Sequence, residues 1–377
     1  MPSQSRLLTL HSASYQLSVS LGGGFVGAFL LKIGFSLTQA LLFYAALLTV
    51  RMGMRFCALA LVRRLGYKYT MIVGVAVSAL QFVSLIRAEY WQWLALWIAT
   101  VSLAESLYWP IYHSASAVVG HKSFGRELGI RAAATSVVNV IGPALGGFVL
   151  ATYGARSEFS LAVLMTLLSI LPLLGLKRIL AGAVPVVRQA IQPSNYRGII
   201  VFAADGWMSS GISISWPMIL FLSLGSRYEA LGLANAGAGL VGALTGLYSG
   251  AVIDRGGRNR SATWVSVALA IGIGLRSAAD WSPLAAAAAN LTGAAVMGLY
   301  VPILMSVMYA GAKRSEGAYS FHFAAEAGWD LGAAGGCLVA AAIASIGPGA
   351  SLTVIPSAMG LVVLYRSLRV VHSPYIP

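Results

Sequence analysis

The chain has 377 residues, of which 58% are hydrophobic and only 10% are charged, and its mean hydropathy is +0.80. The surface of a soluble domain needs about 25% charged residues, so this composition excludes a soluble globular protein, and the apolar content excludes a disordered chain. A net charge of +14 would indicate nucleic-acid binding in a soluble protein, but here we assign the basic residues to membrane anchoring and expect no nucleic-acid partner. The long apolar runs, without the alternation of a β-barrel, predict an all-α membrane protein.

Charged residues, prolines and glycines divide the chain into twelve candidate membrane spans. Twelve helices of about 20 residues use roughly 240 residues, which leaves short connections and no soluble domain. The spans are expected near 15–35, 37–62, 69–88, 91–118, 130–152, 159–177, 198–223, 230–253, 261–280, 284–311, 318–346 and 350–370.

Basic residues are distributed unevenly between the two sides of this topology. If the N-terminus is inside, most of them fall in cytoplasmic connections, as the positive-inside rule requires. We therefore expect both termini to be cytoplasmic, in a multi-pass protein of the bacterial inner membrane. The few basic residues assigned to the outer side are Lys32, Arg87, Arg156, Arg227 and Arg276, and the acidic residues assigned to outer loops are Glu89, Glu158, Glu229 and Asp280.

The sequence also repeats itself. Residues 107–112 (LYWPIY) match residues 299–304 (LYVPIL), 192 positions further along the chain. Half of the chain has a similar length, so the repeat predicts two pseudo-symmetric six-helix bundles, at 1–176 and 198–377, joined by a cytoplasmic linker at 177–197. Such repeats are typical of secondary transporters with a binding site between the halves at mid-membrane.

A loop motif follows the eighth span and reads GAVIDRGGRN from residue 250 to 259. This GxxxDRxGR pattern resembles the cytoplasmic loop signature of the major facilitator superfamily. The resemblance implies a gating role for Gly250, Asp254, Arg255, Gly257 and Arg258.

By the same resemblance, Asp254 faces the start of the fifth span, where Arg131 is either its partner or a simple membrane anchor. The corresponding loop of the first half departs from the family pattern, because Arg63 occupies the acidic position. This departure argues against a symmetric pair of gates.

A second motif lies in the fifth span, where residues 142–147 read GPALGG. It resembles the GPxxGG core associated with exporters of the superfamily, although Val138 replaces a further glycine. Proline removes a helix hydrogen bond and glycines permit close packing, so we expect Gly142, Pro143, Gly146 and Gly147 to form a helix-packing motif. Asn139, one turn earlier, is expected either to hydrogen-bond across the interface or to make a packing contact.

Four acidic residues fall inside predicted spans: Glu105, Asp205, Glu326 and Asp330. Ionisable residues there cost roughly 2.5–3.5 kcal/mol on insertion scales and usually face the bundle interior or a water-filled cavity. These four are therefore the first candidates for substrate binding and proton coupling.

The neighbours of these acids extend the candidate set. His322, Glu326 and Asp330 recur every four residues and share a helix face suited to proton handling, or else form a polar stripe near the cytoplasm. Glu105, Trp109 and His113 share another face, which suits an organic, cationic solute, with an interfacial aromatic belt as the alternative.

The two arginines of the second span, Arg51 and Arg55, admit three interpretations. They neutralise a buried acid, bind an anion, or extend to the membrane surface. No short-range cluster predicts a metal site, no cofactor is expected, and a Walker A sequence is absent from the chain.

We accordingly predict a monomeric secondary active transporter that moves a small solute by alternating access. It is expected to be proton-coupled and an exporter or antiporter. The alternatives are an importer of a small organic solute or metal chelate in the same fold, and a transporter-like sensor or assembly factor. An enzyme is not expected, because the pairing of His113 with Ser114 or Ser116 is too ordinary to indicate a nucleophile beside a base.

Overall fold

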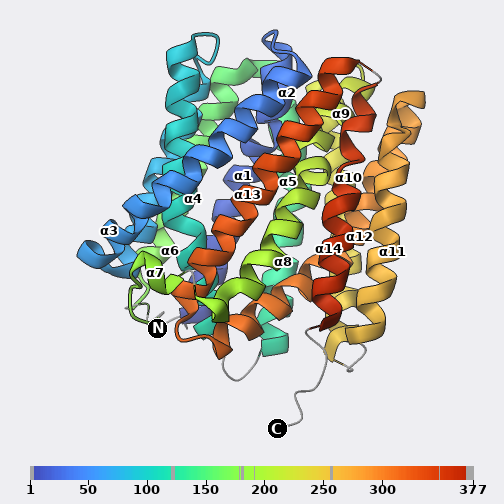
Figure 1. Ribbon diagram of the computed structural model, residues 1–377. Helices are drawn as coiled ribbons and strands as arrows, with labels where there is room; N and C mark the ends of the chain where they lie inside the picture. Colours follow the sequence, from blue (N-terminus) through green and yellow to red (C-terminus); the bar gives the residue numbers. More distant parts are fainter. Residues whose placement is uncertain are drawn as a thin grey trace.

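The structure is a computed structural model, and it describes residues 4–119, 124–177, 179, 182–190, 192–254, 258–347 and 349–370. The regular structure in this part of the chain is helical (Figure 1). The elements are α1 (Gln4–Leu21), η1 (Gly23–Phe25), α2 (Val26–Lys32), α3 (Leu37–Leu85), α4 (Trp91–Val119), α5 (Phe124–Leu168), α6 (Ile170–Leu174), α7 (Val187–Ala190), α8 (Pro193–Ser209), η2 (Ser210–Ser215), α9 (Trp216–Ser223), α10 (Tyr228–Asp254), α11 (Arg258–Ser277), η3 (Ala279–Trp281), α12 (Pro283–Arg314), α13 (Ala318–Ile346), η4 (Ala350–Val354) and α14 (Ser357–Val370).

Nine segments of the described chain are long and apolar enough to cross a membrane. The long helices stand side by side, and the N-terminus lies at the end drawn at the bottom of Figure 1, which we call the lower end. The prediction of an all-α membrane protein is therefore confirmed. Two of the nine segments, Leu37–Leu85 and Val137–Leu174, each overlap two of the spans expected from the sequence.

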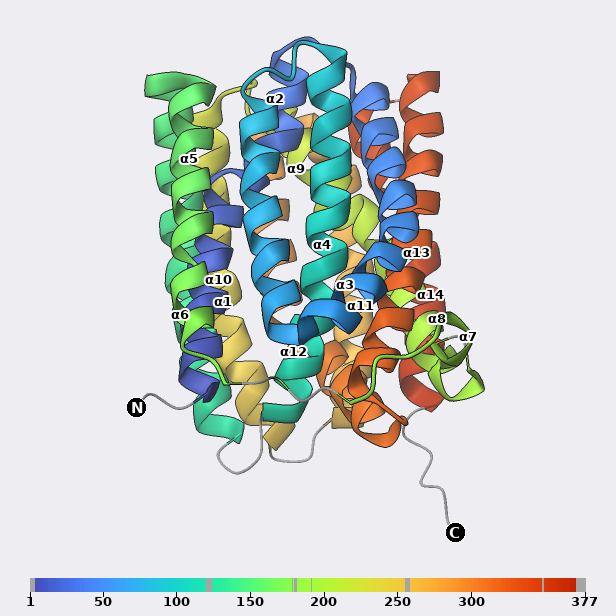
Figure 2. The same cartoon turned by 90° about the vertical axis from the view of Figure 1, so that its left-hand side faces the viewer.

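These two joined segments turn at a glycine. In α3 the backbone leaves the helical conformation at Gly66, with φ 74° and ψ 170°, and in α5 it does so at Gly154, with φ 79° and ψ 174°. Positive φ is costly for residues with a Cβ atom, so glycine is suited to both positions. Figure 2 shows the two arms of α3 lying next to α4, on either side of a turn at the lower end.

The first helix begins earlier than expected, at Gln4 instead of residue 15. The residues before the predicted span are largely polar, and several of them bond to other helices. The His11 side chain contacts the Ser169 carbonyl oxygen at 2.7 Å and the Tyr108 hydroxyl at 3.1 Å. A polar helix face is stable in the membrane when other helices supply its partners.

The two predicted halves meet at two interfaces. In the α3–α13 interface, the first arm of α3 faces α13, which rises from Ala318 at the lower end. In the α5–α10 interface, the backbones come close together: a Cβ atom on Gly147 would lie 2.7 Å from the Tyr228 carbonyl oxygen and 2.9 Å from the Gly232 Cα atom. Only glycine permits this separation.

Apolar clusters lie above and below the middle of the α3–α13 interface. The upper cluster includes Leu41, Met218 and Cys337, all buried. The lower cluster includes Tyr67 and Tyr319, whose ring centroids are 5.0 Å apart. Polar residues between the two clusters are thus enclosed from both ends.

The segment predicted to link the two halves contacts the lower end of α3. Arg63 donates a hydrogen bond from Nη2 to the Pro185 carbonyl oxygen at 2.9 Å, and the Tyr67 hydroxyl donates to the Gly182 carbonyl oxygen at 2.8 Å. Arg63, the residue that departs from the loop motif, therefore binds the linker backbone.

Candidate functional site: a charged cluster between the halves

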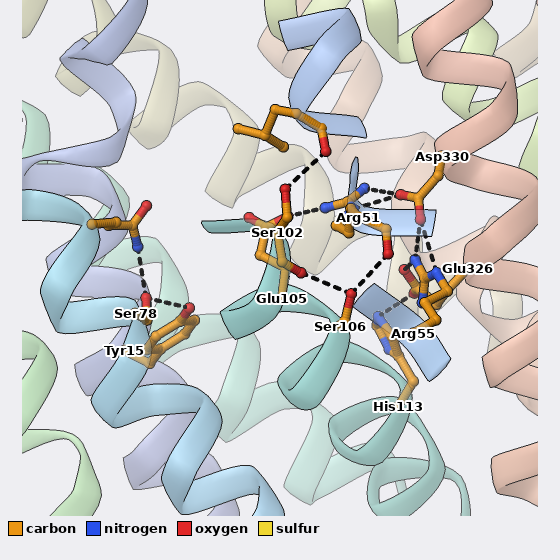
Figure 3. Close-up of polar contacts among 12 residues, drawn as sticks. Tyr15, Arg51, Arg55, Ser78, Ser102, Glu105, Ser106, His113, Glu326 and Asp330 are labelled. Atoms are coloured by element: carbon orange, nitrogen blue, oxygen red, sulfur yellow. Dashed lines mark hydrogen bonds and ion pairs between the residues drawn. The ribbon is translucent and has the colours of Figure 1, made fainter. Parts of the chain in front are cut away.

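The centre of the α3–α13 interface is an ion-pair cluster (Figure 3). Arg51 and Arg55 lie one turn apart on α3, and both point toward Asp330 on α13. Arg51 Nε donates to Asp330 Oδ1 at 2.5 Å, and Arg55 Nε donates to Asp330 Oδ2 at 2.8 Å. The Asp330 carboxylate, which is fully buried, thus joins two guanidinium groups of the other half.

Glu105 on α4 adds a second carboxylate to Arg51, with an ion pair to Nη1. The Glu105 side chain is 29% exposed, compared with 6% for the Arg51 side chain, so it is the most accessible carboxylate of the cluster. Ser106 donates to the Arg51 carbonyl oxygen at 3.0 Å. This bond fixes α4 against α3 beside the ion pairs.

Glu326 lies one turn below Asp330 and has weaker partners. Its Oε2 is 3.8 Å from Arg55 Nη2, and its Oε1 is 3.6 Å from His113 Nε2. His113 in turn is 3.3 Å from the Tyr309 hydroxyl. The cluster therefore continues from α13 through α4 to α12.

His322 completes the face of α13 predicted from the sequence. Its ring stacks on His113 with a centroid separation of 5.5 Å, and it is fully buried. Neither ring nitrogen of His322 has a hydrogen-bond partner among the described residues, and the same holds for Arg55 Nη1. Buried donors and acceptors without partners are costly, so these atoms are candidates for contacts with a solute, water or proton.

Asp205 on α8 is near the cluster but has different partners. The Tyr300 hydroxyl donates to its Oδ1 at 2.6 Å, and the Trp329 indole donates to its Oδ2 at 2.9 Å. The Trp329 ring also faces the Arg51 guanidinium at 5.1 Å. Trp329 therefore connects Asp205 to the ion pairs, although both bonds to Asp205 come from neutral groups.

Trp109 lies at the edge of this arrangement. Its ring stacks on His113, with centroids 5.5 Å apart, and it also makes edge contacts with the rings of Tyr15 and Tyr108. The face of α4 predicted to hold Glu105, Trp109 and His113 thus contacts the cluster at two of its three residues. Trp109 supports the His113 ring.

The structure places Asn139 elsewhere. Its backbone and Cβ occupy the space where a side chain on Gly239 would go, in the α5–α10 interface. It was grouped with the substrate residues, but it does not lie with the charged cluster; it has the packing position that was the alternative expectation.

The GPxxGG residues divide between two neighbours of α5. A Cβ atom on Gly142 or Gly146 would collide with Ser20 or with the Leu21 carbonyl oxygen of α1. Pro143 and Gly147 instead lie against Gly232 of α10. The motif therefore packs α5 against α1 on one side and α10 on the other.

The gating motif is only partly described. Gly250 and Asp254 end α10 and Arg258 begins α11, but Arg255 and Gly257 lie outside the described residues. The side chains of Asp254, Arg258 and Arg131 also lie outside them. The pairing of Asp254 with Arg131 stays a prediction.

Two residues expected in outer loops are buried in helices. Glu158 is fully buried in α5, and Arg276 is 6% exposed in the last turn of α11. The assignment of Glu158 was wrong because α5 continues through the predicted gap between the spans 130–152 and 159–177. Arg276 lies within the predicted span 261–280, near its outer end, and it was assigned to the outer side because a charged residue there was expected to extend to the membrane surface; instead, its side chain packs against the Trp216 ring.

Three contributors were missed by sequence reasoning: Tyr300, Tyr309 and Trp329. The internal repeat contained a signal for the first of them, because Tyr300 matches Tyr108 in the repeated LYxPI motif. Tyr108 contacts His11 of α1, and Tyr300 contacts Asp205 of α8. Each repeated tyrosine therefore binds a polar residue in the first helix of its own half.

Metal binding has no support in the described residues, where no group of three or more His, Cys, Asp or Glu side chains could hold an ion. The site is instead a set of acids, arginines and aromatic residues between two sets of helices. Such a site suits ion pairing, proton exchange and contact with a polar organic molecule.

The fold and this site define an integral multi-pass membrane protein of transporter architecture. Among solved structures, the chain is similar to the fucose:proton symporter of E. coli, at 13% identity, a TM-score of 0.66 and 98% coverage of both chains. A FucP structure in the outward conformation gives 14% identity, a TM-score of 0.68 and 98% coverage of both chains. The human organic anion transporter MFSD10 gives 14% identity, a TM-score of 0.64, and coverage of 98% of this chain and 100% of that one.

The sequence itself assigns the family. The model of the major facilitator superfamily matches residues 8–193. The search of curated protein sequences found no match. The chain belongs to the major facilitator superfamily, as the loop and helix motifs predicted.

Proposed function

We propose that this protein is a proton-coupled secondary transporter that works by alternating access. In this proposal, twelve helices form two six-helix bundles, 1–176 and 198–377, with the 177–197 linker and both termini in the cytoplasm. The observation that carries the proposal is Asp330, whose carboxylate binds Arg51 and Arg55 of the opposite half.

The balance of charge in the cluster supports proton coupling. Among the described residues, three carboxylates share two guanidinium groups, and Glu326 has the longest of these contacts, at 3.8 Å. Asp205 accepts hydrogen bonds from neutral donors. An uncompensated negative charge in a low-dielectric interior costs several kcal/mol, on the order that binding a proton can relieve. We assign proton binding to Glu326 and Asp205.

The same ion pairs supply the coupling between protons and conformation. The halves can separate at the α3–α13 interface only if the bonds from Asp330 to the two arginines break. A proton or a solute that neutralises a member of the cluster weakens these bonds and lowers the cost of opening. His113 and His322, directly below, offer a path for protons toward the lower end.

We further propose antiport with export. The cluster has more acids than cations, so a proton and a cationic solute would compete for the same carboxylates, and Glu105 is accessible to such a solute. The GPxxGG motif also favours export. Symport is the second candidate, because the structural neighbour FucP is a fucose:proton symporter by its printed name.

The decisive experiment follows protons in proteoliposomes loaded with a pH-sensitive dye. Candidate solutes are added in turn: amphipathic cations, L-fucose and other sugars, amino acids, organic anions and metal chelates. We expect at least one of them to move protons in the wild-type protein, and D330N and E326Q to abolish the movement. The direction of proton flow relative to the solute distinguishes antiport from symport.

Glu229 provides the matched control, because it is an exposed acid that pairs with Arg227 far from the cluster. The E229Q variant should transport like the wild type. Solute transport that is insensitive to an imposed pH gradient would contradict proton coupling. If no solute is moved and neutralising Glu105 or Asp330 leaves the cellular phenotype intact, a sensor or assembly role is supported instead.

A further inference from the structure

Three arginine side chains are buried in the described part of the chain, and one of them has a different environment from the others. Arg51 and Arg55 pair with carboxylates of the central cluster. Arg276, which is 6% exposed, has no carboxylate within ion-pair distance among the described residues. A buried charge without a counter-ion is costly, so Arg276 requires an explanation that the central cluster does not give.

The partner that Arg276 does have is aromatic. Its guanidinium lies 5.1 Å from the centre of the Trp216 ring. Its Nε has no hydrogen-bond partner among the described residues. Asp280, the acid next along the chain, accepts bonds from the backbone and hydroxyl of Ser351 instead. A cation–π contact contributes about 2 kcal/mol when it is desolvated. It does not supply a hydrogen-bond acceptor, so the Nε donor stays unsatisfied.

The surroundings hold the guanidinium in one place. The Trp216 indole donates to Asn290 Oδ1 at 2.8 Å, and Asn290 Nδ2 donates to the Ala234 carbonyl oxygen at 3.1 Å. These bonds fix the aromatic ring that supports Arg276. On α12, a Cβ atom at Gly293 would collide with Arg276 Nη2, so this glycine provides the room in which the guanidinium lies.

Open space is present one turn away on the same helix. Gly272 is buried, yet a Cβ atom added to it would meet nothing within 4 Å. Residues 272 and 276 share a face of α11 because they are four positions apart. An unsatisfied donor on a fixed cation therefore lies between α9, α11 and α12, and unfilled space lies one turn away along the same face of α11.

We propose that Arg276 is the centre of an anion-binding site in the C-terminal half, separate from the central cluster, for a small anion such as a halide or a carboxylate. Gly293 lies ten residues after the first residue of α12, or about 15 Å along the helix. This depth favours a small free anion over a lipid phosphate at the membrane surface. The site adds a ligand to the protein and does not depend on the transport proposal.

The test measures thermal unfolding of the purified protein in detergent at constant ionic strength. Sodium gluconate is replaced stepwise by sodium chloride, bromide or acetate. For the wild type we expect a saturable rise in Tm of about a few degrees with at least one of these anions, because a ligand that binds only the folded state stabilises it by mass action. R276Q should lose the rise, and R276K should retain part of it.

Two controls separate this site from other effects. R227Q removes an exposed arginine and should keep the full rise, and E326Q should keep it as well, even though it abolishes proton coupling. An equal rise in R276Q, or no difference among the anions in the wild type, would overturn the proposal. A rise produced only by added phosphatidylglycerol and lost in R276Q would also overturn it, by identifying a lipid headgroup as the ligand.

A second measurement uses the wild type alone and so does not depend on the folding of R276Q. Crystals grown with bromide should give an anomalous peak beside the Arg276 guanidinium. Bromide peaks elsewhere with none at Arg276 would refute the site.

Discussion

The two interfaces between the predicted halves use different chemistry. The α3–α13 interface joins arginines of one half to carboxylates of the other, whereas the α5–α10 interface brings glycine backbones together at Gly147 and Gly232. The internal repeat relates the two interfaces, because α13 corresponds to α5 and α3 to α10, but the buried ion pairs among the described side chains lie at the α3–α13 interface. At the sequence positions 192 residues before Glu326 and Asp330, the chain has Ala134 and Val138.

This difference implies that the two interfaces respond differently to an added charge. Ion pairs respond to a proton or a charged solute, because one added charge changes their energy by several kcal/mol in a buried site. The energy of glycine contacts does not change when a proton or a charged solute binds, since these contacts depend on close backbone packing and carry no charge. In the proposed alternating-access cycle, the charged interface is thus suited to switching, and the glycine interface to a constant, close contact.

The largest effect is expected from D330N at the charged interface. Removing one partner of a buried ion pair leaves two guanidinium groups without their shared carboxylate and should destabilise the protein by about 3–5 kcal/mol. Unfolding in mixed micelles measures the change. The exchanged pair R55D/D330R should recover part of the loss; failure of the exchange together with a mild effect of D330N would contradict the role of these pairs.

The glycine interface should be broken by G147A. The added methyl group would lie 2.7 Å from the Tyr228 carbonyl oxygen, so we expect a loss of about 1–3 kcal/mol from overpacking. G53A is the matched control, because Gly53 is exposed on α3 with nothing within 4 Å of the added atom. There alanine should stabilise the helix, by up to about 1 kcal/mol. Equal thermal stability of the two variants would argue against the close contact.

A smaller effect is expected from Y300F, which tests a hydrogen bond beside the ion pairs of the charged interface. It removes the hydroxyl that donates to Asp205 at 2.6 Å and retains the ring. Loss of this bond should cost about 1.5–3 kcal/mol if Asp205 is ionised, and less if it carries a proton. Y309F is a parallel change at a longer contact, 3.3 Å from His113, and should cost less. Thermal unfolding of both variants decides the order.

The smallest effect is expected at the linker, from R63A. The Arg63 side chain is exposed and donates to one backbone carbonyl oxygen, so its removal should cost about 0.5–1.5 kcal/mol at most. Limited trypsin digestion should nevertheless accelerate at Arg188, because the 182–190 segment loses a contact with α3. Unchanged digestion would mean that the other linker contacts suffice. R64A serves as the control.

A residue type that is unusual for its environment can be recognised from the sequence alone. Glu105, Glu326 and Asp330 stand out because lipid excludes ionised carboxylates, and the four-residue spacing of His322, Glu326 and Asp330 places them on one face of a helix. The superfamily was predicted correctly from the loop and GPxxGG motifs. These inferences use only local composition and periodicity.

Sequence reasoning failed where the answer depends on a partner far along the chain. The sequence left three interpretations of Arg51 and Arg55 open. The structure shows that both arginines neutralise a buried acid, Asp330, which lies 279 and 275 positions further along the chain. Asn139 was grouped with the substrate residues, although Gly239 places it in the other interface. Glu158 was assigned to a loop because the sequence predicts two separate spans where α5 is continuous, and Arg276 was assigned to the outer side because its contact with Trp216 of another helix is not visible in the sequence.

The scarcity of charge in the sequence by itself determined that this is a helical membrane protein, and its motifs determined the superfamily. The pairing of acids with arginines became known only from the distances between helices. The same holds for Arg276, which has no carboxylate within ion-pair distance among the described residues. The physical reason is that insertion into a membrane depends on each residue's own polarity, whereas charge compensation depends on distances between helices. Those distances are fixed by packing at residues such as Gly147 and Gly293, whose importance is not apparent before their neighbours are known.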